Sequence, residues 1–174
     1  MTNPSAKVAY IGLGANLGNR WWALSQAKKR LAAAPGVKFE AASSLYETAP
    51  LGDVAQPNFL NAAVRVRTTL APRQLLALLS EIELALGRER GRPKGPRLID
   101  CDLLLLAQEV LVEDGLVIPH PELTGRLFVL VPLLELDPTL RHPGTGMPLS
   151  AYRQLVMQQE GRRQYVRLME GVGW

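Results

Sequence analysis

The sequence of 174 residues contains a single cysteine, Cys101, and only 6% aromatic residues. One cysteine cannot form an internal disulfide, so nothing in the sequence indicates a secreted fold held together by disulfides. No apolar run approaches the roughly 20 residues that a membrane-spanning helix needs. The polar N-terminus also lacks the pattern of a signal peptide. We therefore expect a cytoplasmic protein with no membrane contact.

The composition is that of an ordinary globular protein, with 47% hydrophobic and 21% charged residues. A formal net charge of +4 is too small to indicate a nucleic-acid partner by itself. No internal repeat, low-complexity tract or linker divides the sequence, so we expect a single domain over residues 1–174. The positive charges are unevenly spread, because five of them lie between Arg88 and Arg97.

Hydrophobic periodicity predicts strands and helices in the order β-α-β-β-α-β. The expected strands cover residues 6–13, 37–48, 59–69 and 98–106. One helix is expected to begin after Asn19 and to end at Pro35, and another to run from Pro72 to Gly87. The buried stripe of the first helix is expected to consist of Trp21, Leu24, Ala27 and Leu31.

This order of elements is that of the α+β ferredoxin-like fold, in which two helices back an antiparallel sheet. The remaining residues predict a C-terminal helical extension of one or two helices, the last over 151–169. The glycine-rich segment 12–18 lacks the Lys-Ser/Thr pair of a P-loop, so we interpret it as a tight turn from strand to helix.

Asp100 and Asp102 lie two residues apart on the last expected strand of the core. Side chains alternate along a strand with a rise of about 3.3 Å per residue, so both carboxylates share one face roughly 7 Å apart. Such a pair can hold one or two hard cations such as Mg²⁺. The alternative is a pair of solvated carboxylates on an exposed face of the sheet.

The basic segment that leads into this strand interleaves glycines and prolines with Arg88, Arg90, Arg92, Lys94 and Arg97. Glycine allows close approach of the backbone to a ligand, and guanidinium and ammonium groups match phosphate oxygens. A solubilising surface loop is the alternative interpretation. The segment joins the aspartate strand directly, so its basic side chains lie next to the two possible metal ligands. This combination favours an enzyme that transfers phosphoryl groups from a nucleotide.

Weaker signals indicate a second, flat substrate. Phe59 and Asn61 have the same strand parity, which places a stacking ring and an amide on one side, unless both are simply packing residues. The segment 48–52 offers backbone groups just before them. His120 lies between two prolines in an extended segment and is either a ligand contact or a polar surface residue.

With these residues in view, the sequence resembles the 6-hydroxymethyl-7,8-dihydropterin pyrophosphokinases. The resemblance covers nearly the whole chain and rests on the segments YIGLGANLGNR, SSLYETAPLG, QPNFLNAAV, IELALGR, GPRLIDCDLLLL and IPHPELTGRLFVLVPL. It implies a ferredoxin-like fold and transfer of the β,γ-diphosphate of ATP to the hydroxymethyl group of the pterin. AMP would be released, and the reaction would serve folate biosynthesis.

The resemblance also implies roles for individual residues. Asp100 and Asp102 would bind two Mg²⁺ ions that bridge the triphosphate, with Arg88 and Arg97 as further catalytic residues. The implied ATP site comprises Arg88, Arg90, Arg92, Lys94, Arg97, His120 and Arg126. The implied pterin pocket comprises Thr48, Leu51, Gly52, Phe59, Asn61 and Phe128, with the ring held between the two aromatics. Glu83 matches a family position that would support the site.

The sequence departs from the family pattern at Lys94, where members commonly carry an aromatic residue, often tryptophan. The basic segment is also one residue shorter, and Phe59 stands where many members have tyrosine. We expect the partners to be ATP and the dihydropterin, with no nucleic acid, and we expect a monomer.

Two alternative functions fit parts of the pattern. A ferredoxin-like module could bind nucleic acid through the basic segment without catalysis, although few aromatic residues are present to stack bases. Another Mg²⁺-dependent nucleotidyl or glycosyl transferase could use the same Asp-x-Asp pair. The nucleotide product, AMP or ADP, would distinguish these enzymes.

Overall fold

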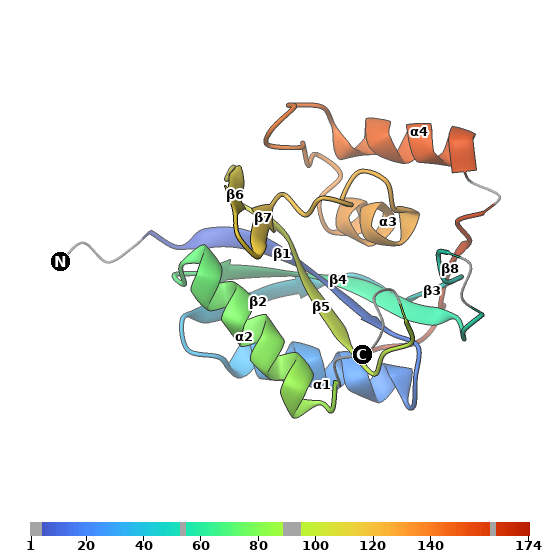
Figure 1. The fold of residues 1–174 in the computed structure, drawn as a ribbon, viewed down its shortest axis with the longest axis horizontal. Helices are drawn as coiled ribbons and strands as arrows, with labels where there is room; N and C mark the ends of the chain where they lie inside the picture. Colours follow the sequence, from blue (N-terminus) through green and yellow to red (C-terminus); the bar gives the residue numbers. More distant parts are fainter. Residues whose placement is uncertain (1–4, 53–54, 89–94, 161–162) are drawn as a thin grey trace.

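The chain folds around one antiparallel sheet with helices on both faces, as Figure 1 shows for a computed structural model. The structure describes residues 5–52, 55–88, 95–160 and 163–174. The sheet contains β1 (Lys7–Ala15), β2 (Val37–Ala42), β3 (Tyr46–Thr48), β4 (Phe59–Thr68), β5 (Asp100–Leu106) and β8 (Val166–Leu168). A separate hairpin is formed by β6 (Leu111–Glu113) and β7 (Leu116–Ile118). The helices are α1 (Arg20–Ala33), α2 (Pro72–Ala85), α3 (Leu127–Leu136) and α4 (Leu149–Glu160).

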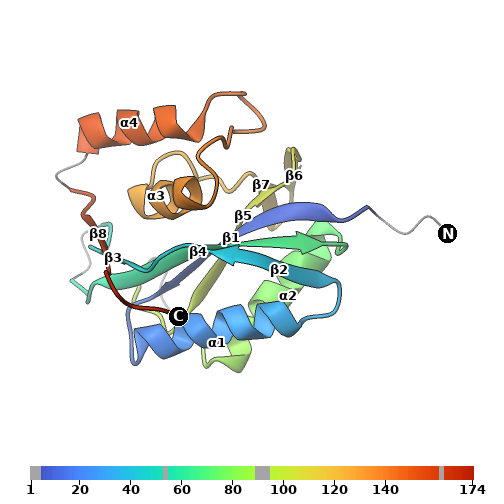
Figure 2. The ribbon, with the colours of Figure 1, turned by 180° about the vertical axis from the view of Figure 1, so that it is seen from behind.

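The strand order β5-β1-β4-β3-β8, with β2 also paired to β4, places β1 and β4 at the centre of the sheet. Helices α1 and α2 cover one face, while α3 covers the other and α4 lies outside α3, as the views from both sides agree (Figures 1 and 2). The predicted ferredoxin-like α+β fold is therefore confirmed, with α3 and α4 added on the face opposite α1 and α2 and β8 added to the edge of the sheet (Figures 1 and 2).

Two hydrophobic cores lie on the two faces of the sheet. Along β4, Ala62, Val64 and Val66 pack into the core under α1 and α2. Ala63 points the other way, into the core that α3 and α4 complete. Burial on both faces fixes the register of β4, because a slip of one residue would exchange the two sets of side chains.

The helix signals near α1 and α2 are confirmed except at one position. The side chain of Asn19 accepts a hydrogen bond from the Trp22 amide at 3.0 Å, and Gly87 after α2 has a φ of +86°. Trp21 does not belong to the buried stripe, because its side chain is 43% exposed. Its indole nitrogen instead donates to the carbonyl of Gly173 at 2.9 Å.

The predicted strand over 37–48 is wrong as a single element, because it is divided into β2 and β3. The Ser44 amide donates to both carboxylate oxygens of Glu135 on α3, at 2.9 and 3.0 Å. The hydroxyl of Ser43 meanwhile accepts a hydrogen bond from the Ala63 amide of β4. The Ser44 amide is thus bonded to the Glu135 carboxylate, whereas in a continuous strand it would donate to a neighbouring strand of the sheet.

The predicted helix over 151–169 is also wrong in its second half. Helix α4 ends at Glu160, and β8 follows as an edge strand in which Val166 lies opposite Thr48 of β3. The backbone of this segment thus pairs with β3 instead of forming helical hydrogen bonds. No helix among the described residues is both long and apolar enough to cross a membrane.

Candidate active site

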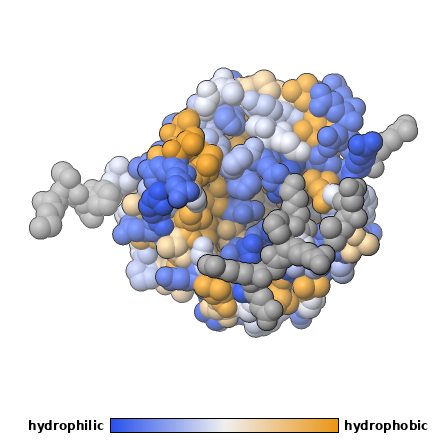
Figure 3. All heavy atoms as spheres, in the orientation of Figure 1, coloured by the Kyte–Doolittle hydropathy of each residue, from blue (hydrophilic) through white to orange (hydrophobic). Residues whose placement is uncertain are grey.

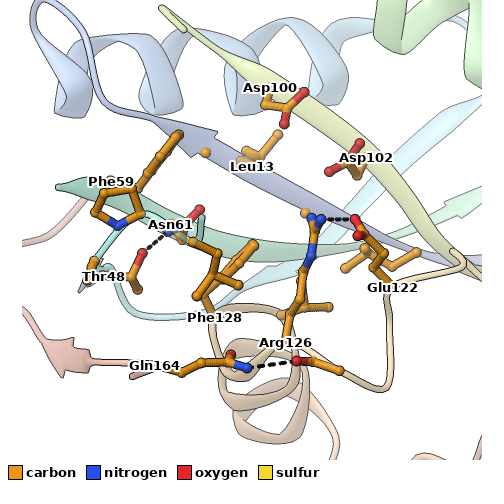
Figure 4. Close-up of a pocket in the computed structure, with 18 of the residues that line it drawn as sticks. Leu13, Thr48, Phe59, Asn61, Asp100, Asp102, Glu122, Arg126, Phe128 and Gln164 are labelled. Atoms are coloured by element: carbon orange, nitrogen blue, oxygen red, sulfur yellow. Dashed lines mark hydrogen bonds and ion pairs between the residues drawn. The ribbon is translucent and has the colours of Figure 1, made fainter. Parts of the chain in front are cut away.

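A pocket of about 590 Å³ lies between the sheet and the start of α3. Figure 4 shows its side chains arriving from β3, β4, β5, the start of α3 and the segment after α4. On the face of the molecule drawn in Figure 3, hydrophilic residues gather between α3 and β5, and apolar colour gathers over the β6–β7 hairpin.

The floor of the pocket is made by two glycines inside β1, where the sequence predicted a turn. Gly12 lies opposite Asp102 and Gly14 lies opposite Asp100 in the antiparallel register of β1 and β5. A Cβ atom on Gly14 would come within 2.6 Å of the Asn61 side-chain oxygen. Glycine at position 14 thus lets the Asn61 amide pack directly on the backbone of β1, which continues through this segment to Ala15.

Asp100 is held by two arginines from the ends of the basic segment. Arg88 donates to one carboxylate oxygen at 2.6 Å, and Arg97 donates to the other. Arg88 also contacts Glu83, whose carboxylate accepts the Cys101 amide at 2.6 Å. Burial raises the pKa of Glu83 to about 7, although these two donors oppose the increase.

Asp102 lies on the same side of β5 and lines the pocket with Asp100. Burial raises the pKa of Asp102, and the neighbouring charge of Asp100 raises it further. The imidazole of His120 lies 3.9 Å from Asp102, and burial lowers the pKa of His120. Arg126 points from the start of α3 toward Asp102 and forms an ion pair with Glu122 (Figure 4). Two half-buried acids thus face basic groups from three segments.

The flat part of the pocket lies around Asn61, between Phe59 and Phe128 (Figure 4). The side-chain nitrogen of Asn61 donates to the Thr48 hydroxyl at 2.6 Å, and both residues are buried. Leu51 and Gly52 line the same side of the pocket. An amide fixed between two aromatic rings can read the hydrogen-bonding edge of a planar ligand.

The structure brings most of the residues predicted from sequence into this one pocket. Those that line it are Thr48, Leu51, Gly52, Phe59, Asn61, Arg97, Asp100, Asp102, Arg126 and Phe128. Arg88 and His120 stand behind the lining and contact the pocket through Asp100 and Asp102. Arg90, Arg92 and Lys94 lie outside the described residues.

Sequence reasoning missed Asn16, a buried residue beside the pocket that is 3% exposed. Its side-chain nitrogen donates to Gln56 and to the Pro57 carbonyl, both at 3.0 Å, and its oxygen accepts the Arg97 amide at 2.8 Å. It therefore ties the segment before Phe59 to the segment before Asp100. The sequence offered only one sign of this role, an asparagine within the glycine-rich segment 12–18. Asparagine in such a segment is usually explained by a hydrogen bond within a turn.

Asp100 and Asp102 are a fitting donor set for Mg²⁺. Among the described residues no group of three or more His, Cys, Asp or Glu side chains forms a complete metal site. Mg²⁺ is commonly bound by one or two carboxylates, with phosphate oxygens and water as the other ligands. The pKa of Asp102 is raised by partial desolvation and by the neighbouring charge of Asp100, and a bound cation would offset both effects.

Comparison with known proteins identifies relatives along most of the chain. The family model described as 7,8-dihydro-6-hydroxymethylpterin-pyrophosphokinase matches residues 10–138. The 2-amino-4-hydroxy-6-hydroxymethyldihydropteridine pyrophosphokinase of Methylorubrum extorquens is 47% identical over 132 residues, which cover 76% of this chain and 84% of that protein. The protein of the same name from Bacillus subtilis is 45% identical, over 74% of this chain and 77% of its own length.

Longer proteins match as well. The folic acid synthesis protein fol1 of Pneumocystis carinii is 39% identical over 88% of this chain, which spans 21% of the fungal protein. A crystal structure of Plasmodium falciparum HPPK-DHPS with pteroate superposes with a TM-score of 0.73 at 15% identity. It covers 94% of this chain and 45% of that one, and at this identity it supports the fold alone.

Proposed function

The chain belongs to the 7,8-dihydro-6-hydroxymethylpterin-pyrophosphokinase family, and from this premise we propose how its pocket carries out the reaction. The chain is an enzyme of folate biosynthesis, with ATP as co-substrate. It transfers a pyrophosphoryl group to hydroxymethyldihydropterin. In our proposal the pterin hydroxymethyl oxygen forms a bond to the β-phosphorus of ATP. The bond between that phosphorus and the oxygen that bridges it to the α-phosphorus breaks, and AMP leaves.

The pterin ring binds between Phe59 and Phe128, with its edge at Asn61. The Thr48 hydroxyl engages the nitrogen of the Asn61 amide, so the amide oxygen is the atom left to accept a ring N–H. Leu51 and Gly52 close the same wall. A polar atom fixed among apolar surfaces supports recognition of a planar ligand, because a competitor without the N–H leaves that atom unpaired.

The triphosphate binds at the other end of the pocket. Arg97 and Arg126 line this end and supply positive charge toward the phosphates, and Arg88 contributes from behind through Asp100. His120 lies beside this end of the pocket, 3.9 Å from Asp102, and belongs to the proposed ATP site. Asp100 and Asp102 would hold two Mg²⁺ ions, which would neutralise phosphate charge and bring the reacting oxygens into line.

One observation carries the proposal: a single pocket joins the Asn61 region to the Asp100–Asp102 pair. A nucleic-acid-binding module requires no such junction, and the family match favours the enzyme over that alternative. The same match disfavours another nucleotidyl or glycosyl transferase. The arrangement therefore supports transfer between two small ligands held side by side.

The nucleotide product tests the proposal. The chain is incubated with ATP, Mg²⁺ and 6-hydroxymethyl-7,8-dihydropterin, and nucleotides are separated by ion-exchange chromatography. We expect one AMP for each pterin diphosphate formed, and no AMP when the pterin is omitted. ADP as the product, or AMP that appears without pterin, would contradict the proposed reaction.

We also propose that residues 1–174 act as one pterin pyrophosphokinase domain, as a monomer in the cytoplasm and without nucleic acid. The single main sheet, which runs from β1 to β8, supports one cooperative unit. Sizing chromatography should then give a mass near 19.1 kDa. A stable dimer at micromolar concentration would contradict the monomer.

A further inference from the structure

Gln164 is a buried polar residue beyond the family match, which ends at residue 138. It follows α4, lines the active-site pocket and is only 4% exposed. A glutamine is rarely buried unless its amide is fully bonded, because an unpaired polar group costs free energy in the interior. Its contacts therefore indicate what holds it in this position.

The Gln164 amide bonds the turn at the start of α3 on both sides. Its oxygen accepts the Leu127 amide at 2.8 Å, and its nitrogen donates to the Gly125 carbonyl at 2.9 Å. The same nitrogen donates to the carboxylate of Glu160 at 3.0 Å. Each of these atoms has a partner, so Gln164 replaces the solvent that the turn would otherwise bind.

Helix α3 needs this partner, because its own cap does not supply one. Arg126 occupies the N-cap position, and its side chain makes no capping hydrogen bond. The Leu127 amide is one of the first N–H groups of the helix, which have no acceptor within the helix. Gln164 thus acts as a cap provided by a residue that is distant in sequence.

The capped turn carries two of the residues that the pocket presents to its ligands. Arg126 points toward Asp102, and Phe128 faces Asn61 (Figure 4). The guanidinium carbon of Arg126 lies 5.4 Å from the centre of the Phe128 ring, so the two side chains pack against each other. A shift of the turn would therefore displace a phosphate contact and a ring contact at once.

The residues after Gln164 join the opposite wall of the pocket. Val166 of β8 pairs with Thr48 of β3, and the Ala49 amide donates to the Tyr165 carbonyl at 3.3 Å. Thr48 in turn holds the amide of Asn61. The segment 164–168 therefore links the α3 wall to the wall that contacts the pterin edge.

We propose that Gln164 is a positioning residue for catalysis, which fixes the turn that carries Arg126 and Phe128 against the wall formed by β3. This inference rests on the proposed function. Without the Gln164 amide, the turn keeps its place in the fold but samples more positions. The pterin is then bound less tightly, and Arg126 is less well placed toward the phosphates.

Gln164→Leu is the first test, because leucine is of similar size and removes both hydrogen-bonding atoms. We expect the KM for the dihydropterin to rise about tenfold, which corresponds to about 1.4 kcal/mol of weaker binding. AMP should remain the product. Gln158→Leu makes the same chemical change at an exposed position of α4 and should leave both KM values unchanged.

Gln164→Glu tests the direction of the hydrogen bonds. Its carboxylate still accepts the Leu127 amide, but it loses the donor to Gly125 and adds a second charge beside Glu160. This variant should also raise the KM for the pterin, and adding Glu160→Gln should restore part of the loss by returning a donor. Restoration by a second exchange is not expected of a residue that only fills space.

A double-mutant comparison separates positioning from stability. If Gln164 acts through Phe128, Gln164→Leu in a Phe128→Ala background should add less than twofold to the KM for the pterin. A wild-type KM in Gln164→Leu, with only a lower urea midpoint, would overturn the inference, as would failure of both Gln164 variants to fold. AMP formation by the wild-type chain tests the proposed function separately, and its absence would overturn both.

Discussion

Replacing Asn16 by alanine removes three hydrogen bonds that join separate segments at the edge of the active site. The Asn16 nitrogen bonds Gln56 and the Pro57 carbonyl, and its oxygen bonds the Arg97 amide. Backbone bonds from the Asn16 and Leu17 amides to the Arg97 carbonyl remain in the variant, at 3.1 and 3.3 Å. The change therefore loosens the junction and leaves its backbone contacts in place.

The three lost bonds set the size of the effect. A typical intramolecular hydrogen bond contributes about 1 kcal/mol to the free energy of unfolding, so Asn16→Ala should lose about 3 kcal/mol. With a urea dependence of about 2 kcal/mol per molar, the midpoint of unfolding should fall by about 1.5 M. The KM values for both substrates should rise, because the segments that the side chain joins belong to the two halves of the pocket.

Urea unfolding followed by tryptophan fluorescence measures the loss, and a steady-state assay of AMP measures the KM values. Asn58→Ala is a matched control, because Asn58 is exposed and its backbone carbonyl, which accepts from Arg20, is retained. The control should change the free energy of unfolding by less than about 0.5 kcal/mol. A loss below about 1 kcal/mol in Asn16→Ala would refute the reasoning, since each lost bond averages about that much.

Three further predictions concern the acids and the floor of the pocket. Asp102→Asn should lower kcat by about 10²-fold or more while the urea midpoint is kept, and full activity would contradict the metal assignment. Burial raises the pKa of Glu83 to about 7 from 4.5, so the folded state binds its proton more tightly. In EDTA, the contribution of Glu83 to the free energy of unfolding should therefore fall between pH 4.5 and 7 by up to about 3 kcal/mol, and Glu83→Gln should remove that part of the decline. Gly14→Ala should raise the KM for the pterin, because the added Cβ would meet Asn61 at 2.6 Å, whereas Gly173→Ala meets no atom within 4 Å and should not.

Local signals predicted the core of the fold well. Pro72 and Gly87 define the ends of α2 through their own backbone preferences, which need no tertiary information. Strand parity likewise placed Asp100 and Asp102 on one face of β5, and both line the pocket. These features depend on residues within a few positions of one another, so a single sequence contains them.

Features that depend on distant partners were not predictable in the same way. The break between β2 and β3 is maintained by Glu135, which is 91 positions from Ser44 in the sequence. The strand β8 forms because β3 offers an edge, although its sequence fits a helix. Asn16 and Gln164 belong to the site because of partners that only the folded chain brings near them.

The residues that line the pocket are far apart in the sequence, from Gly12 near one end of the described chain to Gln164 near the other. Contacts over such long sequence separations form late in folding, because closing each loop costs entropy before the contact is gained. A partly folded chain therefore presents no complete site for a substrate to bind. Bound substrates stabilise the native state without stabilising the folding transition state. Saturating substrate should therefore slow the unfolding of this chain and leave its refolding rate unchanged.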